Sequence, residues 1–577
     1  MQMASEISTA IKGMDKLYEF EREPVSEDKL QPAKHFAGVF AGEHVAGTEF
    51  VIGGLFVAWG ATARDIFLGL LVGNLLAVLT WTLVCAPIAV QTRLTLYWYL
   101  RKIAGPVTTT LYNILNAVLF CILAGCMITV SASAVRIPFG IPEQTGWVPS
   151  DFRFVIVVVC VGAVVVTLAI LGFKRLAQFA EVCSPWMFLM FIAGAVAMLP
   201  DLANRVLAGQ MGSLDDFWTI ANKAIWTGTT DDGRPTTIGF YHVAAFAWIC
   251  NLAMHGGLSD MALLRYARKA SYGLFSAFGM FLGHYLAWIC AGIMGATTAL
   301  ILQKGMGQLD AGGVAYQALG VIGIVAVILA GWTTSNPTLY RAGLAFQAVT
   351  PGWPRWLVTL IAGAITTLIA CSPFVFTKLL DFVGYYGLLL MPVGAIVFVE
   401  HWIFPKIGLT RFWVSKKGRT FSWPALAAWT IAIAAALILE KTGTLHLFFL
   451  FVPVWALTAV LYIVFASIAG AREKFPQEAT QEPAAPAPSP EYKEPSAAEL
   501  YKFPPPRPKP DPVVWIAAVV SLLCLAACLI LPLWVYKAGT ARYEENFTLF
   551  KKLLIWPSLI YFIAGTIWAV KRDKARP

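Results

Sequence analysis

The segment AGVFAGEHVAGTEFVIGG, residues 37–54, decides the fold, because it is an apolar run interrupted by glycines and by four polar or charged side chains. A helix that crosses a membrane must satisfy its own backbone hydrogen bonds, so such an interruption predicts backbone that faces a cavity. A second segment, AWICNLAMHGGLSDMALLRYARK at 247–269, is interrupted in the same way. The two interruptions fall one in each half of ten predicted helices. This pattern predicts two five-helix repeats of opposite orientation.

The composition is that of a multi-pass membrane protein. Of the 577 residues, 58% are hydrophobic and only 13% are charged. Apolar stretches of about 18 to 25 residues recur, and each is long enough to cross a bilayer as a helix. Transmembrane β-strands would be about 10 residues long with alternating polarity, so a β-barrel is excluded. Coiled-coil and nucleic-acid-binding classes are excluded with it.

The predicted spans form a twelve-helix body and a C-terminal two-helix hairpin, about 14 transmembrane helices in all. Apolar length and helix breakers place them at 37–59, 66–91, 107–134, 154–173, 183–200, 240–258, 272–302, 316–349, 354–372, 376–401, 423–440, 445–470, 513–536 and 552–570. The domains are then a cytoplasmic N-terminal tail (1–35), the twelve-helix body (36–470), a Pro-rich, disordered cytoplasmic linker (471–512) and the hairpin with its tail (513–577).

The net charge of +10 is concentrated in short loops, which orients the chain. Cytoplasmic loops are enriched in Lys and Arg. This bias places both termini in the cytoplasm and assigns Arg265, Arg341 and Arg355 to cytoplasmic loops. The longest opposite loop, 201–239, carries five aspartates instead.

The end of the eighth span, LAGWTTSNPTLYRAGLAF at 329–346, predicts a cation site. Ala330, Thr333 and Thr334 stand at i, i+3 and i+4, so one carbonyl and two hydroxyls converge on one helix face. Together with carbonyls freed by a broken helix, they would supply the oxygens that a small hard cation prefers. The alternative is that the hydroxyls only bond back to the preceding turn.

Four motifs make the chain resemble the nucleobase:cation symporter-1 family, which includes cytosine and hydantoin transporters. They are FLGLLVGNLLAVL (67–79), QTRLTLYWYLRKIAG (91–105), SDMALLRYARK (259–269) and GWTTSNPTLYRAGLAF (331–346). The resemblance covers roughly residues 36–470 and leaves the final hairpin out. It implies an all-α, leucine-transporter-like 5+5 inverted-repeat fold, alternating access and a location in the plasma membrane.

The resemblance also implies a sodium site. Carried over by position, its ligands are the carbonyls of Gly42 and Ala46 in the first helix and of Ala330 in the eighth, with the hydroxyls of Thr333 and Thr334. The eighth-helix residues are those that the spacing predicts. The first-helix residues depend on the alignment of Ile52–Gly54, where a slip of one residue would move the ligands.

A substrate site is implied between the third and sixth helices, where the family stacks a flat heterocycle between aromatic side chains. The third-helix position falls at Phe120, with Asn116 one turn earlier, and a π-face beside amides suits a planar, hydrogen-bonding ring. On the sixth helix the register leaves Trp248, Asn251 and His255 as candidates. The chain departs from the family at two polar positions, where it carries Gly47 and Ala117.

Carboxylates within a span are costly and therefore functional candidates. Glu49 is predicted to accept N–H donors of the substrate, and Glu43 or His44 to carry a proton, which would make the coupling H⁺ or mixed. The alternative is a carboxylate paired with a buried His or Arg for structural reasons.

These observations predict a secondary transporter that imports a nucleobase-like heterocycle (purine, pyrimidine, hydantoin or allantoin class) with Na⁺. The alternatives are a proton-coupled permease using Glu43 and His44, or a transporter-derived membrane receptor. No HExxH, GxSxG or P-loop motif occurs, so an enzyme is not expected, nor is a cofactor besides the coupling ion. The expected partners are the heterocycle, Na⁺ or H⁺ and the lipid bilayer, without nucleic acid. The hairpin is expected to pack against the body or a second protomer and to take no part in transport.

Overall fold

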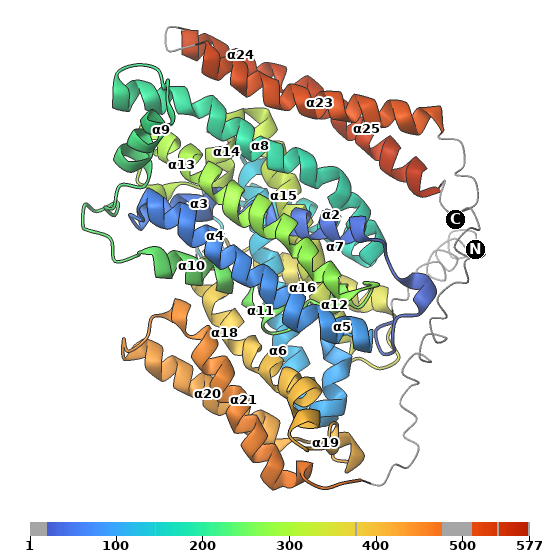
Figure 1. Ribbon diagram of the computed structural model, residues 1–577. Coiled ribbons are helices and arrows are strands. Elements are labelled where there is room, and N and C mark those ends of the chain that lie inside the picture. The colour runs from blue at the N-terminus through green and yellow to red at the C-terminus, as the bar shows by residue number, and fades with distance from the viewer. Residues whose placement is uncertain (1–19, 145, 375–377, 476–510, 539–541, 575–577) are drawn as a thin grey trace, which may run out of the picture.

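The computed structural model describes residues 20–144, 146–374, 378–475, 511–538 and 542–574. The described chain is helical, as predicted (Figure 1). Eleven of its helices are long and apolar enough to cross a membrane, and three shorter apolar helices lie at Glu49–Ala58, Phe240–Ile249 and Arg355–Ala370. The shorter helices correspond to the predicted first, sixth and ninth spans.

The body is built from a long series of packed helices. Its first half contains α2 (Ala33–His44), α3 (Glu49–Ala58), α4 (Ala63–Thr80), α5 (Ala86–Thr92), α6 (Leu96–Val135), α7 (Phe152–Ile170), α8 (Phe173–Leu207) and α9 (Leu214–Ile220). Its second half contains α10 (Phe240–Ile249), α11 (Leu252–His255), α12 (Met261–Leu264), η6 (Phe278–Ala287), α13 (Trp288–Leu302), α14 (Ala311–Leu319), α15 (Val321–Gln347), α16 (Arg355–Ala370), α18 (Leu379–Phe398), α20 (Trp423–Lys441) and α21 (Phe451–Ala466).

Both predicted interruptions are real breaks in the helices. The first span divides into α2 and α3, and Val45 between them has non-helical angles of φ −87° and ψ 64°. The sixth span divides into α10, α11 and α12. Asn251 leaves the helical region at φ −114° and ψ 33°, and Leu258 takes a positive φ of 63°. The broken segments are enclosed by other helices, so the backbone groups freed by each break face protein instead of lipid.

Several span boundaries differ from the prediction. The third span extends back to Leu96, because Gly105 adopts a φ of 75° before Pro106 and lets the chain kink and continue as α6. The fifth span, α8, is 35 residues long. The predicted eighth span is two helices, α14 and α15, which meet at Gly320 with a φ of 62°. Only glycine adopts such angles without strain, which is why Gly105 and Gly320 occupy the two positions where the chain bends within a predicted span.

The N-terminal residues that the structure describes pack onto the body. The Arg22 guanidinium donates to the carbonyls of Gln347 (2.9 Å) and Thr350 (2.8 Å). The Val25 N–H donates to the Arg93 carbonyl over 3.0 Å. The final stretch of the predicted tail, residues 20–32, is therefore anchored beside the carboxyl end of α15.

The C-terminal hairpin, α23 (Pro512–Lys537), α24 (Tyr543–Leu553) and α25 (Ile555–Lys574), lies along α8 (Figure 1). Trp186 of α8 donates to Ser558 over 2.9 Å, and Tyr561 donates to the Val182 carbonyl over 2.7 Å. Of the two predicted packing modes, the structure shows the one against the body. Most of the predicted linker, residues 476–510, lies outside the described residues.

Candidate functional site

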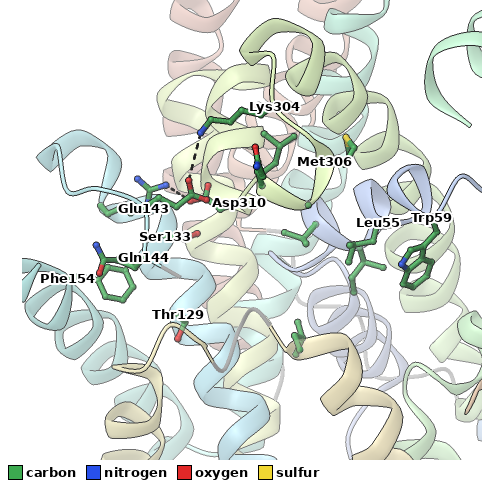
Figure 2. A pocket seen from close by; sticks show the side chains of 17 residues that line it. Leu55, Trp59, Thr129, Ser133, Glu143, Gln144, Phe154, Lys304, Met306 and Asp310 are labelled. Carbon is green, nitrogen blue, oxygen red and sulfur yellow. Dashed lines mark hydrogen bonds and ion pairs between the residues drawn. The ribbon is translucent and has the colours of Figure 1, made fainter. Parts of the chain in front are cut away.

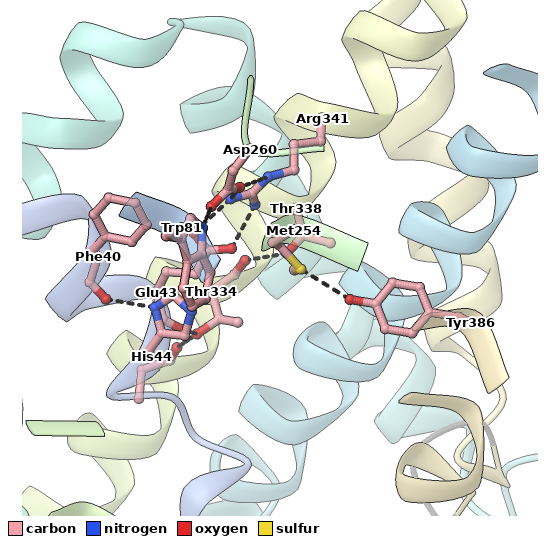
Figure 3. Close-up of polar contacts among 11 residues, drawn as sticks. Phe40, Glu43, His44, Trp81, Met254, Asp260, Thr334, Thr338, Arg341 and Tyr386 are labelled. Atoms are coloured by element: carbon pink, nitrogen blue, oxygen red, sulfur yellow. Dashed lines mark hydrogen bonds and ion pairs between the residues drawn. The ribbon is translucent and has the colours of Figure 1, made fainter. Parts of the chain in front are cut away.

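A cluster of oxygen atoms lies where α2 ends beside α15. The Thr334 hydroxyl is 2.7 Å from the Glu43 carbonyl (Figure 3) and 3.0 Å from the Ala330 carbonyl. The Thr333 hydroxyl is 3.1 Å from the same Ala330 carbonyl. The two threonines thus bond back to their own helix, as the structural alternative predicts, and Thr334 also reaches across to the first broken helix.

The first-helix residues predicted as ligands have their own surroundings. The Ala46 carbonyl accepts from the Glu49 N–H over 3.2 Å, within the link between α2 and α3. Gly42 faces α8, where an added Cβ would lie 2.9 Å from the Ala180 Cβ. The carbonyl found against Thr334 is that of Glu43, one residue beyond Gly42. Gly42 and Ala46 stay predicted ligands, and this contact adds the Glu43 carbonyl beside them.

Gly47 is required by packing. An added Cβ would lie 2.8 Å from the Val130 side chain of α6 and 3.2 Å from the Val327 carbonyl of α15. Both distances are shorter than a normal carbon contact, and the carbonyl belongs to a rigid helix. The absence of a side chain at position 47 lets the broken first helix approach two other helices closely.

A buried ion-pair network, which we call the inner gate, joins three elements beside the oxygen cluster (Figure 3). The Arg341 guanidinium of α15 donates to both carboxylate oxygens of Glu43, over 2.6 and 2.9 Å. It also donates twice to Asp260 Oδ1, over 2.9 and 2.5 Å. The Trp81 indole donates to the other Asp260 oxygen over 2.6 Å. Arg341 and Asp260 are 0% exposed.

The inner gate corrects the assignment of Arg341 to a loop, whereas Arg265 does lie in the turn that follows α12. Arg341 lies inside α15, seven residues beyond Thr334, and Arg265 is also fully buried. A buried charge is tolerated only when it is paired and hydrogen-bonded. Glu43 is therefore paired with a buried arginine, as expected under the alternative in which this carboxylate has a structural role. Two carboxylates against one guanidinium leave the gate with a formal charge of −1.

A second buried cluster surrounds Glu49. Its carboxylate accepts a hydrogen bond from the Trp288 indole, and His284 Nε2 lies 3.7 Å from its other oxygen. The His284 ring is 5.2 Å from the ring of His44, whose Nδ1 is 2.8 Å from the Phe40 carbonyl. Glu49 is 2% exposed. The Glu49 carboxylate thus contacts an indole and an imidazole, whereas Glu43 is held by a guanidinium.

The predicted third-helix residues lie on the buried face of α6. Phe120 is 0% exposed, its ring meets the Tyr386 ring edge-on at 5.9 Å, and the Arg341 guanidinium lies 6.0 Å from its centroid. The Asn116 amide nitrogen is 3.2 Å from Ser259 Oγ. Its buried Oδ1 has no hydrogen-bond partner among the described residues. Phe120 and Asn116 thus place an aromatic face and an unsatisfied acceptor one turn apart.

The sixth-helix candidates lie around the break in that helix, and their contacts are with residues other than Phe120. Trp248 donates to Thr80 over 3.0 Å, and its ring meets Phe451 at 5.0 Å. His255 Nε2 is 2.9 Å from the Trp248 carbonyl. Asn251 lies at the break itself, and its buried Nδ2 lacks a hydrogen-bond partner among the described residues. The aromatic ring that the structure places against Phe120 is Tyr386 of α18, which the sequence analysis missed.

A cavity of about 610 Å³, which we call the vestibule, opens on the face opposite the two described chain ends (Figure 2). Val51 and Ile52 of α3 and Thr129 of α6 line its inner part. At its mouth Arg136 pairs with Asp310, and Lys304 lies 4.0 Å from Glu143 (Figure 2). Burial and the nearby Asp310 carboxylate raise the pKa of Glu143.

The vestibule and the inner gate lie on opposite sides of the broken first helix. α3 lines the vestibule, whereas the last turn of α2 enters the gate. The buried centre is thus approached by a cavity from one face and closed by ion pairs toward the other. Two broken helices, a buried polar centre and this one-sided opening define a membrane transporter of the two-repeat class.

No family model matches the chain. Cytosine permease of Escherichia coli K12 is 24% identical over 384 residues, which cover 65% of this chain and 79% of the permease, and cytosine permease of E. coli O6:H1 matches equally. Among solved structures, Mhp1, a nucleobase-cation-symport-1 family transporter in a closed conformation with bromovinylhydantoin bound, matches with a TM-score of 0.61 at 14% identity, covering 79% of this chain and 98% of Mhp1. A Na⁺-coupled sialic acid symporter matches with a TM-score of 0.56 at 13% identity, covering 80% and 97%.

These matches agree with the four sequence motifs. The structural matches show the leucine-transporter-like fold, and the permease match adds a relative in sequence. The chain is therefore similar in sequence to cytosine permease and in fold to a nucleobase-cation-symport-1 family transporter.

Proposed function

We propose that the protein is a secondary transporter that imports a nucleobase-like heterocycle together with Na⁺ by alternating access. The observation that carries this proposal is the oxygen cluster at the break of the first helix. There the Thr334 hydroxyl lies within hydrogen-bond reach of the Glu43 and Ala330 carbonyls, and the Thr333 hydroxyl lies within reach of the same Ala330 carbonyl. The likeness to cytosine permease supports the substrate class.

A sodium ion would replace the hydrogen bonds within this cluster. Four neutral oxygens from two helices are the kind of ligand set that a small hard cation prefers, and a carbonyl of Gly42 or Ala46 would complete it. The inner gate adds a formal charge of −1 close to the cluster, which favours a cation in a low-dielectric interior.

The substrate would bind between α6 and the sixth-helix break. The Phe120 face suits stacking with a flat ring, and Asn116 Oδ1 would accept a ring N–H. Glu49 would accept further N–H donors, and Asn251 Nδ2 would donate to a ring carbonyl. In the described conformation Phe120 is fully buried, so ring entry requires side chains such as Tyr386 to move.

The test is a stability screen with heterocycles, with and without Na⁺, because a ligand that binds only the folded protein raises its melting temperature. Thr334→Ala and Thr333→Ala should weaken the Na⁺-dependent shift, and Thr334→Ser should retain it because the hydroxyl remains. Thr430→Ala is the matched control, since this exposed hydroxyl bonds back to Leu426 on α20.

Uptake in vesicles distinguishes the alternatives. Uptake that does not depend on Na⁺ but is abolished by a protonophore would refute sodium coupling. It would indicate a proton-coupled permease that uses Glu43 or His44. Na⁺-dependent binding without uptake would indicate the membrane receptor. We include in this proposal a location in the plasma membrane with both termini in the cytoplasm, which protease access from each side of the membrane tests. It also includes a homo-oligomer formed through the hairpin, which the mass of the purified protein tests.

A further inference from the structure

A second cavity, of about 440 Å³, lies between the hairpin and the body, and we call it the hairpin cavity. Five structural elements contribute its walls: α2, α8, η6 and the hairpin helices α23 and α25. It is separate from the vestibule, since the two share no lining residue. Neither the sodium site nor the substrate site proposed above uses its side chains.

The walls of the hairpin cavity are apolar along most of its length. Small residues of α2 leave the space open, and larger side chains from the other elements close it. The apolar lining consists of Ala37, Gly38, Ala41, Pro185, Phe188, Leu189, Phe278, Leu282, Leu525 and Trp568. Phe278 is 45% exposed although it is apolar, as expected of a wall that faces the hydrocarbon of a membrane. A water-soluble ligand would have no apolar groups to pack against these walls.

Charged side chains gather at one end of the cavity. Arg572 of α25 donates to Glu181 of α8 over 2.5 Å, and the Lys34 ammonium of α2 lies 3.9 Å from the same carboxylate. Lys34 is the second residue of α2 and Arg572 is near the end of α25, so both lie at the membrane surface. Among the lining residues, two cations face one carboxylate, which leaves a net positive charge at this end.

We propose that the hairpin cavity binds a phospholipid with an anionic headgroup, whose phosphate contacts Arg572 and Lys34 and whose acyl chain lies along the apolar walls. Arginine and lysine are the side chains that bind phosphate groups. Basic pockets between membrane helices on the cytoplasmic side bind anionic headgroups in this way. The bound lipid would join the hairpin to the first broken helix, because its two cations come from α25 and α2.

The experiment measures melting temperatures of the full-length protein in detergent with added dioleoyl-phosphatidylglycerol, dioleoyl-phosphatidylcholine or glycerol 1-phosphate. Phosphatidylglycerol should stabilise the protein more than phosphatidylcholine, and glycerol 1-phosphate should have no effect because it lacks acyl chains. Arg572→Gln should lower the apparent affinity for phosphatidylglycerol about tenfold, the loss expected for one charge-assisted hydrogen bond.

Lys571→Gln is the matched control, because Lys571 is the neighbouring cation, is exposed, pairs with Asp511 and does not line the cavity. It should bind phosphatidylglycerol like the parent protein. Leu525→Trp fills the apolar part and should reduce the response to phosphatidylglycerol while the protein stays monodisperse. Equal stabilisation by both lipids, equal losses in Arg572→Gln and Lys571→Gln, or an unchanged response in Leu525→Trp would overturn the proposal. A response to glycerol 1-phosphate alone would show an anion site instead of a lipid site.

Discussion

Replacing Glu43 by glutamine should open the inner gate. In the structure the Glu43 carboxylate receives two hydrogen bonds from Arg341, which ties the end of α2 to α15. A glutamine has one carbonyl oxygen in place of two carboxylate oxygens, so at most one of these bonds remains and it loses its charge. Arg341 keeps both bonds to Asp260 and is therefore still paired, which spares the variant the larger cost of an unpaired buried cation.

The magnitude follows from the lost bond. A hydrogen bond to a charged group contributes about 1.5 to 3 kcal/mol, and about 1.4 kcal/mol corresponds to a tenfold change in an equilibrium constant. If the gate is closed in one conformation and open in the other, Glu43→Gln should shift the population toward the open form about 10- to 100-fold.

A cysteine at position 39 reports this shift. Val39 lies on α2 one turn before Glu43, is 5% exposed, and lines a small crevice with Thr333 and Asn336. In a background without the ten native cysteines, Val39→Cys should react slowly with a membrane-impermeant maleimide from the cytoplasmic side. Adding Glu43→Gln should raise the initial labelling rate by the same factor as the population shift.

Glu440→Gln is the control for this experiment, since Glu440 accepts from Tyr385 near the surface of α20, away from the gate. It should leave the labelling rate of the cysteine unchanged. A rate in the Glu43→Gln protein equal to that of this control would refute the gate, provided that both proteins elute as folded monodisperse samples.

Three further predictions concern the substrate site and the hairpin. Phe120→Ala should reduce heterocycle affinity by about 0.5 to 1.5 kcal/mol, the contribution of an aromatic pair, plus the effect of the lost contact area, whereas Phe120→Trp should be tolerated. Equal affinities of the parent protein and Phe120→Ala, measured by calorimetry, would show that Phe120 is not the stacking residue. Glu49→Gln should weaken binding of N–H-rich rings at normal folded yield, and a loss of folded protein with unchanged affinity would instead assign Glu49 a structural role through Trp288. Truncation after Arg472 should lower the folded yield, because the contacts with α8 are lost, but should leave the initial uptake rate per folded molecule largely intact; a slower rate at normal folding would place the hairpin in the transport mechanism.

The sequence predicted the features that depend on local chemistry. Glycines beside polar side chains within apolar runs indicated both helix breaks, and the spacing of Ala330, Thr333 and Thr334 indicated a common face. These predictions succeed because a lipid environment leaves few alternatives for backbone groups. The positions of Gly105 and Gly320 show the limit: each glycine takes a positive φ, but one kinks a continuous helix and the other separates two helices.

The inner gate could not be predicted, because it depends on contacts between residues far apart in the chain. Glu43 and Arg341 are separated by 298 positions, and Arg341 and Asp260 by 81. An arginine near the end of an apolar run is typical of a cytoplasmic loop, which is where the charge bias assigned Arg341. Only the packing of α15 against the two broken helices shows that its charge is buried and paired. Tyr386 was missed for the same reason, because nothing near it in sequence indicates Phe120.

The gate and the oxygen cluster involve the same two helices, and this connects ion binding to conformation. The backbone carbonyl of Glu43 contacts Thr334, while its side chain contacts Arg341 seven residues further along α15. A cation held between the carbonyl and the threonines would draw α2 toward α15 and thereby favour the closed gate. By linkage, closing the gate must then increase affinity for the cation by the same factor. Weakening the gate at Glu43 should therefore weaken Na⁺ binding even though no ligand oxygen is removed, whereas Thr334→Ala should both weaken Na⁺ binding and raise the labelling rate at position 39. If Glu43→Gln changed only the labelling rate and Thr334→Ala changed only Na⁺ binding, the gate and the cation site would be independent.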